Sequence, residues 1–158
     1  MVDEIDKALL SEFADDSKKS VKDLAKKMNV HPNTLLLRTR KLERSGIIKS
    51  YVAALDYEKL GYGVNALVLI KIEMKNDWEK KLDDISKIPE ILLLMSISGE
   101  ADAFAVVSTK NRDEFYNILK RINNNPVVTK TTTHFVMNSY KLPCDFNPLK
   151  TPSVPSPE

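Results

Sequence analysis

A very short connection separates two expected helices near the N-terminus and restricts how this part of the chain can fold. Ser20 and Asp23 form a capping-box pattern that starts a helix of about two turns. His31 and Pro32 follow within a few residues, and Pro suits the first position of a further helix that runs to Gly46. Two helices joined so tightly are typical of a helix-turn-helix, whose second helix enters the major groove of DNA.

Positive charge is concentrated in the same segment. The whole chain has a formal net charge of +2, but residues 18–50 carry ten Lys and Arg against two acidic residues. Residues 1–17 carry one base and six acids, and the remaining residues are close to neutral. A basic block of this kind indicates a nucleic-acid surface, although a solvated helical face would also explain it.

The candidate DNA-binding residues lie on the helix that starts at Pro32. Leu35, Thr39 and Leu42 form its expected inner stripe. The candidates outside this stripe are His31, Asn33, Thr34, Leu37, Arg38, Arg40, Lys41 and Arg44. His31 is a weaker helix cap than Ser, so its imidazole has two open roles, as a weak cap or as a phosphate contact. Leu36 and Leu37 either meet thymine methyl groups or pack on neighbouring helices, and packing is favoured for one of them.

The pattern changes after residue 63. Residues 47–52 are rich in strand formers, and residues 51–63 are expected to be a linker strand that separates two domains. Apolar residues then alternate from Val64 to Met74, which predicts a strand. A helix over residues 78–88, strands over 91–98 and 103–108, a helix from Asn111 and a strand over 127–137 complete the order βαββαβ, a ferredoxin-like sandwich.

These patterns predict an α+β chain with an N-terminal winged helix-turn-helix domain over residues 1–50. The ferredoxin-like βαββαβ domain covers residues 64–140 and is expected to oligomerise. Residues 141–158 are rich in Pro, and a flexible tail is expected over 151–158.

The expected sheet has apolar residues on both faces, although two helices cover only one. Leu67 and Leu69 point away from Val68 and Ile70, and residues 91–95 have no polar face. A homodimer with sheet packed on sheet would cover the second face. The alternative is that the N-terminal domain folds back over it.

Short motifs are distributed along the chain in a characteristic order. They are Asp3-Glu4-Ile5-Asp6, Asp23-Leu24-Ala25, Arg38 followed by Lys41-Leu42-Glu43, Gly46-Ile47-Ile48-Lys49 before Tyr51, Leu60-Gly61, Gly99-x-x-Asp102 and a Thr-rich strand that ends in Lys141. Together they resemble the Lrp/AsnC family of transcription regulators, also called leucine-responsive or feast/famine regulators. The resemblance implies a sequence-specific regulator that binds double-stranded DNA, forms homodimers that assemble further to tetramers or octamers, and senses an amino acid or another small molecule. Family members commonly have Ser at the position of His31 and an aliphatic residue at that of Thr39, so the match departs from the family pattern there.

The candidate effector site joins a loop and a facing strand of the C-terminal domain and is expected to lie between subunits. It consists of Gly99, Glu100, Ala101, Asp102, Thr131 and Thr133. Its carboxylates suit an ammonium group, its backbone amides suit a carboxylate, and the threonine hydroxyls come from the strand expected beside it. An alternative explanation is that the loop only connects two strands, and that the run of Thr residues is present because Thr favours strands.

Enzymatic chemistry is not expected from this sequence. The two histidines are His31 and His134, the one cysteine is Cys144, and the four glycines match no nucleotide-binding loop, so no metal and no cofactor is predicted. The main alternative is a haem-pathway decarboxylase-like enzyme with the same two-domain plan, and an RNA-binding domain is weaker still because Phe104 is the only aromatic on the central strands. The N-terminus lacks a signal-peptide pattern and the apolar runs are too short to span a bilayer, so a cytoplasmic protein is expected.

Overall fold

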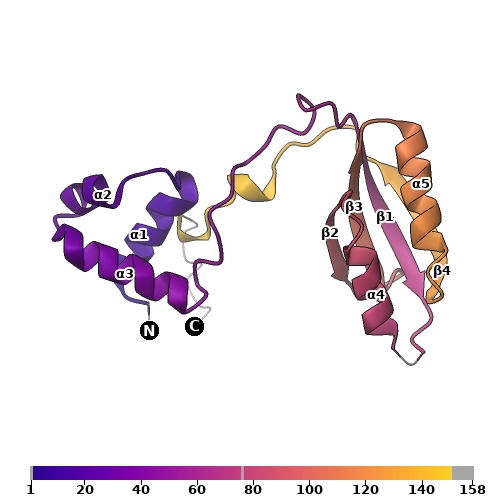
Figure 1. The fold of residues 1–158 in the computed structure, drawn as a ribbon, viewed down its shortest axis with the longest axis horizontal. Coiled ribbons are helices and arrows are strands. Elements are labelled where there is room, and N and C mark those ends of the chain that lie inside the picture. Colours follow the sequence, from indigo (N-terminus) through magenta and orange to yellow (C-terminus); the bar gives the residue numbers. More distant parts are fainter. Residues whose placement is uncertain (1, 76, 151–158) are drawn as a thin grey trace, which may run out of the picture. The chain divides into compact units, whose positions relative to one another are not determined.

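The computed structural model describes residues 2–75 and 77–150 and divides the chain into two compact units (Figure 1). The first, here called the helical unit, combines the described residues 2–54 and 140–150. The second, the sheet unit, covers residues 55–139. None of the helices in the described residues is long and apolar enough to cross a membrane.

Three helices make up the first part of the helical unit: α1 (Glu4–Asp15), α2 (Val21–Lys27) and α3 (Pro32–Arg44). A complete capping box of Asp3 and Asp6 starts α1, and the Ser20 side chain accepts a hydrogen bond from the Asp23 N–H to start α2. The helices enclose a small apolar core of Leu9, Leu24, Ala25, Leu35 and Leu42. The expected helix-turn-helix is therefore confirmed.

The sheet unit has the expected βαββαβ order. Its elements are β1 (Val64–Ile72), α4 (Trp78–Ser86), β2 (Ile91–Ser96), β3 (Ala103–Thr109), α5 (Arg112–Asn123) and β4 (Val128–Phe135). The four strands lie in the order β2-β3-β1-β4, and each neighbouring pair is antiparallel. This is the strand order of a ferredoxin-like sheet, and the α+β fold class is confirmed.

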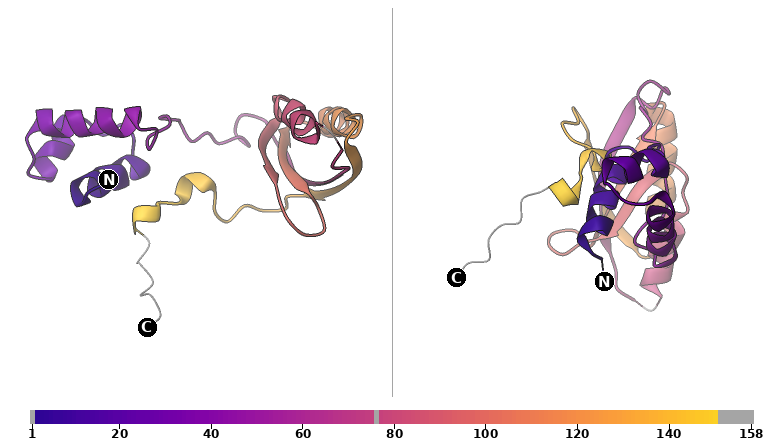
Figure 2. Two further views of the ribbon diagram at one scale, coloured as in Figure 1. Left: turned by 90° about the horizontal axis from the view of Figure 1, so that it is seen from below. Right: turned by 90° about the vertical axis from the view of Figure 1, so that its left-hand side faces the viewer.

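Both helices of the sheet unit pack on the same face of the sheet (Figure 2). Alternate residues of β1, namely Ala66, Val68, Ile70 and Ile72, are buried on that face. They share one core with Leu82 and Ile85 of α4 and with the buried side of α5. Burial of this apolar area is the main stabilising contribution to the unit.

The opposite face of the sheet, here called the open face, is apolar and carries no helix of this unit. Strand register places Leu67 beside Val106 and Leu69 beside Phe104. On β2, Leu93 and Met95 continue the same face and are 40% and 51% exposed. A contiguous exposed apolar surface of this kind is typical of an interaction site.

Two sequence expectations differ from the structure. Residues 45–63, all of them described, contain no strand, so neither the linker strand nor a β-hairpin wing is formed. Strand formers such as Ile47 and Val52 adopt a strand only where another strand satisfies their backbone groups, and none lies beside them among the described residues. Part of the Pro-rich end also forms short 3₁₀ helices, η1 (Pro143–Asp145) and η2 (Pro148–Lys150), and the tail predicted over 151–158 lies outside the described residues.

Candidate DNA-binding surface and effector loop

Helix α3 buries one stripe of side chains and presents the opposite stripe to solvent. The buried stripe is Leu35, Thr39 and Leu42. The opposite stripe, here called the outward stripe, follows the spacing i, i+4, i+7, i+11 and contains Asn33, Leu37, Arg40 and Arg44, all exposed. Thr34 and Lys41 flank it and are also exposed. Six of the eight predicted DNA-binding residues therefore share one accessible surface.

Two unusual residues of α3 have local structural roles. Thr39 is 5% exposed, and its hydroxyl donates a 2.9 Å hydrogen bond to the Leu35 carbonyl, so the buried polar atom is satisfied. His31 is the N-cap, and its Nδ1 accepts a hydrogen bond from the Asn33 N–H at 3.3 Å. The imidazole thus caps the helix in place of the Ser hydroxyl.

The two leucines next to the buried stripe remain accessible. Leu36 is 37% exposed and Leu37 is 65% exposed. Leu37 has little packing within the helical unit and lies in the middle of the outward stripe. Of the two residues, Leu37 is the better candidate for contact with a partner, because a large exposed apolar side chain gains free energy when it is covered.

Arg38 points toward α1 instead of along the outward stripe. Its guanidinium donates to the Asp6 carboxylate at 2.8 Å and to the Asp3 carboxylate. These bonds raise the pKa of Arg38, and Asp6 contributes most. Asp6 is almost fully buried, so it depends on this cation for charge compensation. Arg38 fastens α3 to the start of α1, so its guanidinium is already engaged within the helical unit.

Replacing Arg38 with Met is expected to destabilise the helical unit by roughly 1–2 kcal/mol, because the buried Asp6 carboxylate loses its charged donor. Thermal unfolding followed by circular dichroism measures the change. Arg40→Met removes the same charge from the outward stripe and serves as the control. Equal melting temperatures for Arg38→Met and Arg40→Met would contradict the assigned role.

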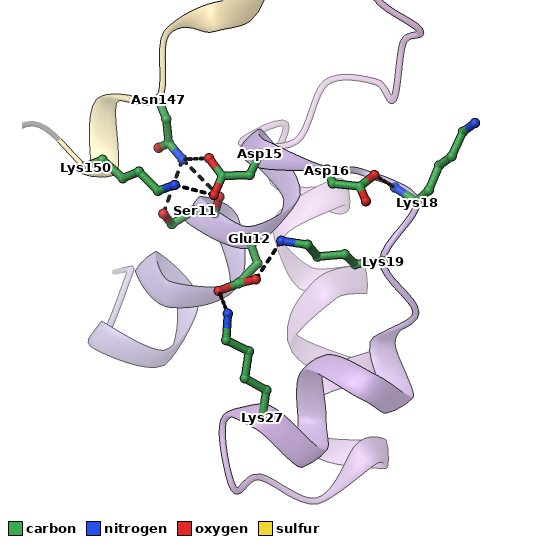
Figure 3. Close-up of polar contacts among 9 residues, drawn as sticks. All are labelled: Ser11, Glu12, Asp15, Asp16, Lys18, Lys19, Lys27, Asn147 and Lys150. Carbon is green, nitrogen blue, oxygen red and sulfur yellow. Dashed lines mark hydrogen bonds and ion pairs between the residues drawn. The ribbon is translucent and has the colours of Figure 1, made fainter.

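The basic residues on and beside the outward stripe differ from other basic residues of the helical unit in their ion pairs within the described residues. Lys19 and Lys27 both pair with Glu12 of α1 (Figure 3). In contrast, none of Arg40, Lys41 and Arg44 has a carboxylate within ion-pair distance in the part of the chain that the structure describes. Their positive charge is available for phosphates or base edges.

Several carboxylates of α1 have a lowered pKa. For Asp3 the main cause is the hydrogen bond from the Asp6 backbone, and for Glu12 it is the bond from Lys27. For Asp15 it is the bond from Lys150. The stabilisation from these groups is present above their ordinary values of 3.8 for Asp and 4.5 for Glu, and is lost as pH falls through the lower folded pKa values.

The helical unit is therefore expected to lose stability when the pH falls below about 4.5. Added salt should weaken the stabilisation near neutral pH, because these ion pairs are largely exposed. Circular dichroism of α-helix content during an acid titration measures the effect. A helical signal that stays unchanged down to pH 2 would contradict it.

The predicted effector loop is fastened to the end of β1. The Asp102 N–H donates to the Ile70 carbonyl at 3.0 Å, and the Asp102 carboxylate accepts from the Ile72 N–H at 2.9 Å. Gly99 has a φ of 126°, which a residue with a side chain rarely adopts. Glu100 is exposed and Ala101 is buried. Asp102 therefore has a structural role in addition to any contact with a ligand.

The threonine strand is not the neighbour of this loop, in contrast to the expectation. Strand β1 lies between β3 and β4. Thr131 pairs with Ile70 from the β4 side, whereas the loop residue Asp102 bonds to the Ile70 carbonyl from the β3 side, so the two residues are separated by β1. Thr131 and Thr133 share the helix-covered side with Ile70 and Val68, and the Thr131 hydroxyl contacts the Asn123 side chain at 2.9 Å.

The described residues contain no group of three side chains arranged to hold a metal ion.

Comparison with known proteins agrees with both units. The chain matches two family models, "Winged helix-turn-helix DNA-binding" over residues 2–49 and "Lrp/AsnC ligand binding domain" over residues 65–144. It is 32% identical to the transcriptional regulator AzlB of Bacillus subtilis over 161 residues, which covers 100% of this chain and 98% of AzlB.

A further relative and a solved structure also match most of the chain. The DNA-binding transcriptional activator DecR of Escherichia coli is 34% identical over 146 residues, which covers 89% of this chain and 95% of DecR. A crystal structure of a Neisseria meningitidis transcriptional regulator in complex with L-Met has the same fold, with a TM-score of 0.84 at 22% identity and coverage of 90% of this chain and 94% of that one. The chain therefore belongs to the Lrp/AsnC family of DNA-binding transcription regulators.

Proposed function

We propose that the protein binds double-stranded operator DNA through the outward stripe of α3, as a homodimer, and that an amino acid adjusts this binding. The observation that carries the proposal is the separation of roles on α3. Arg38 is held inside the helical unit, whereas Arg40, Lys41 and Arg44 are exposed and unpaired within the described residues. A helix with this distribution fits the recognition helix of a helix-turn-helix.

Each residue type on this surface suits a particular contact. Arg40 and Arg44 suit guanine edges, Asn33 suits adenine, and Leu37 suits a thymine methyl group. Lys41 lies beside the stripe and suits a phosphate, as do His31 and Thr34 near the helix N-terminus. Fluorescence anisotropy of labelled DNA at several salt concentrations tests the surface. We expect affinity to fall steeply with salt.

The open face of the sheet supports the homodimer. A second copy would bury Leu67, Leu69, Phe104 and Met95 against the same residues of its partner. The two α3 helices of a dimer would then read two half-sites. Further assembly to tetramers or octamers and a cytoplasmic location belong to the same proposal.

The exposed Glu100 is the carboxylate best placed for an effector ammonium group, because Asp102 already accepts the Ile72 N–H. The L-Met bound to the Neisseria meningitidis regulator supports an amino acid as the ligand class. Gly99 and Ala101 belong to the same loop, and because β1 separates this loop from Thr131 and Thr133 within one chain, those hydroxyls would complete the proposed site from a second copy. The haem-pathway decarboxylase alternative has less support, since the relatives named above are transcription regulators.

Glu100→Gln is expected to weaken amino-acid binding about tenfold or more, because it removes a charge-assisted hydrogen bond. Isothermal titration calorimetry with the twenty amino acids identifies the ligand and measures the loss. Glu79→Gln, an exposed change on α4, is the control. Absence of heat with all twenty, or equal affinity in Glu100→Gln, would contradict the effector site while leaving DNA binding untouched.

A further inference from the structure

The end of the chain returns to the DNA-binding helices. Residues 143–150, here called the C-terminal segment, contain η1 and η2 and lie in the helical unit. The Asn147 amide donates to the Ser11 carbonyl at 3.0 Å and to the Asp15 carboxylate at 2.8 Å, and Lys150 forms an ion pair with the other oxygen of Asp15 (Figure 3). Residues more than 130 positions apart in the sequence are thus joined by side-chain contacts.

The charge at the end of α1 explains why this contact forms. Glu12, Asp15 and Asp16 lie at or next to the last turn, which contains no basic residue. Carboxylates at a helix C-terminus are unfavourable because the helix dipole is negative there. Lys150 supplies the missing cation and lowers the pKa of Asp15, and Asn147 adds to the same effect.

The contact also gives the helical unit a second connection to the sheet unit. One connection is the chain around residue 54, and the other is the chain around residue 140, whose continuation docks on α1. The start of α1 holds α3 through Arg38, and its end holds the C-terminal segment. One helix therefore joins the DNA-contacting helix to the end of the chain that leaves β4.

We propose that the C-terminal segment is a reversible latch on α1 that restricts the movement of the helix-turn-helix. The docking itself does not depend on the proposed function, but its effect on operator binding does. The contacts are polar and largely exposed, so they open more readily than a buried interface and are weakened by salt. A helix-turn-helix held at two points loses less freedom when a dimer engages two half-sites together.

The single cysteine offers a native probe of the docking. Cys144 is exposed and precedes Asn147 by three positions. A nitroxide attached there should broaden the NMR signals of α1 amides near Ser11 and Asp15 in the full-length protein. Lys150→Glu should remove the broadening, and the added change Asp15→Lys should restore it. Lys18→Glu, a matched charge reversal, should leave it intact.

Two results would overturn the docking. The first is an absence of broadening in the unchanged protein, and the second is broadening that survives Lys150→Glu. A mixture of nitroxide-labelled chains with isotope-labelled Cys144→Ser chains separates the two possible origins. Broadening in that mixture would show that the segment docks on a second copy, which contradicts a latch within one chain.

The functional arm compares operator DNA with DNA that carries a single half-site. Asn147→Ala combined with Lys150→Gln should lower the ratio of the two affinities roughly two- to fivefold. Lys18→Gln removes one positive charge per chain without touching the latch, so comparison of its ratio with that of the double variant separates the latch from the charge effect. An unchanged ratio would overturn the effect on binding. If the unchanged protein binds neither DNA, the proposed function fails, and the nitroxide result still decides the docking.

Discussion

Replacing Arg40, Lys41 and Arg44 together by alanine is expected to reduce operator affinity by about a hundredfold or more. Each base contact of this kind contributes roughly 1–3 kcal/mol, and every 1.4 kcal/mol is about tenfold in affinity. All three side chains are exposed, so the fold of the helical unit should remain intact. Gel-shift titration at one fixed salt concentration measures the loss, and circular dichroism checks the fold.

The matched control removes three lysines from the sheet unit instead. Lys80, Lys110 and Lys120 are exposed and belong to other surfaces. The control variant has the same net charge as the α3 variant, so a general charge effect would weaken both proteins equally. Operator affinity that is unchanged in the α3 variant, or equally lowered in the control, would contradict the assignment of α3.

Replacing Leu69 with Asp is expected to convert the proposed dimer to monomers. Leu69 lies between Phe104 and Thr132 on the open face, near the centre of the sheet. A carboxylate there would be buried without a partner in a sheet-to-sheet interface, which costs more than one such contact provides. Multi-angle light scattering measures the mass. Operator affinity should fall at the same time, because a monomer reads one half-site.

The control for this change is Asn117→Asp, which adds the same charge at an exposed position of α5. It should remain dimeric. Two results would count against the sheet-to-sheet dimer: an unchanged protein that is monomeric at micromolar concentration, and a Leu69→Asp protein that retains the dimer mass.

The fold was predictable because its signals are local. The pair Ser20 with Asp23 marks a helix start by a short-range hydrogen bond, and the structure contains this bond. The alternation along β1 likewise depends only on which face is buried. Residues 47–52 show the limit of such signals, because strand propensity without a neighbouring strand does not produce a strand.

The candidate site was predictable only in part, because its polar contacts join distant residues. Arg38 borders the buried stripe, and its position on the helix does not show whether DNA or a carboxylate receives its charge. That depends on Asp6, more than thirty residues earlier. The docking of Asn147 on Ser11 has no local pattern at all, apart from the uncompensated acidic end of α1. The separation of Thr131 from Asp102 by β1 follows from the sheet order and not from either motif.

Selection of bound sequences from random double-stranded DNA tests the central claim most directly. If the protein is a dimeric regulator that reads DNA with α3, the enriched sequences should contain two half-sites related by two-fold symmetry. Their centres should lie about 10 base pairs, or a multiple of this, apart. The variant that lacks Arg40, Lys41 and Arg44 should enrich no sequence. The absence of any enriched motif with the unchanged protein, or the same motif with that variant, would contradict the account.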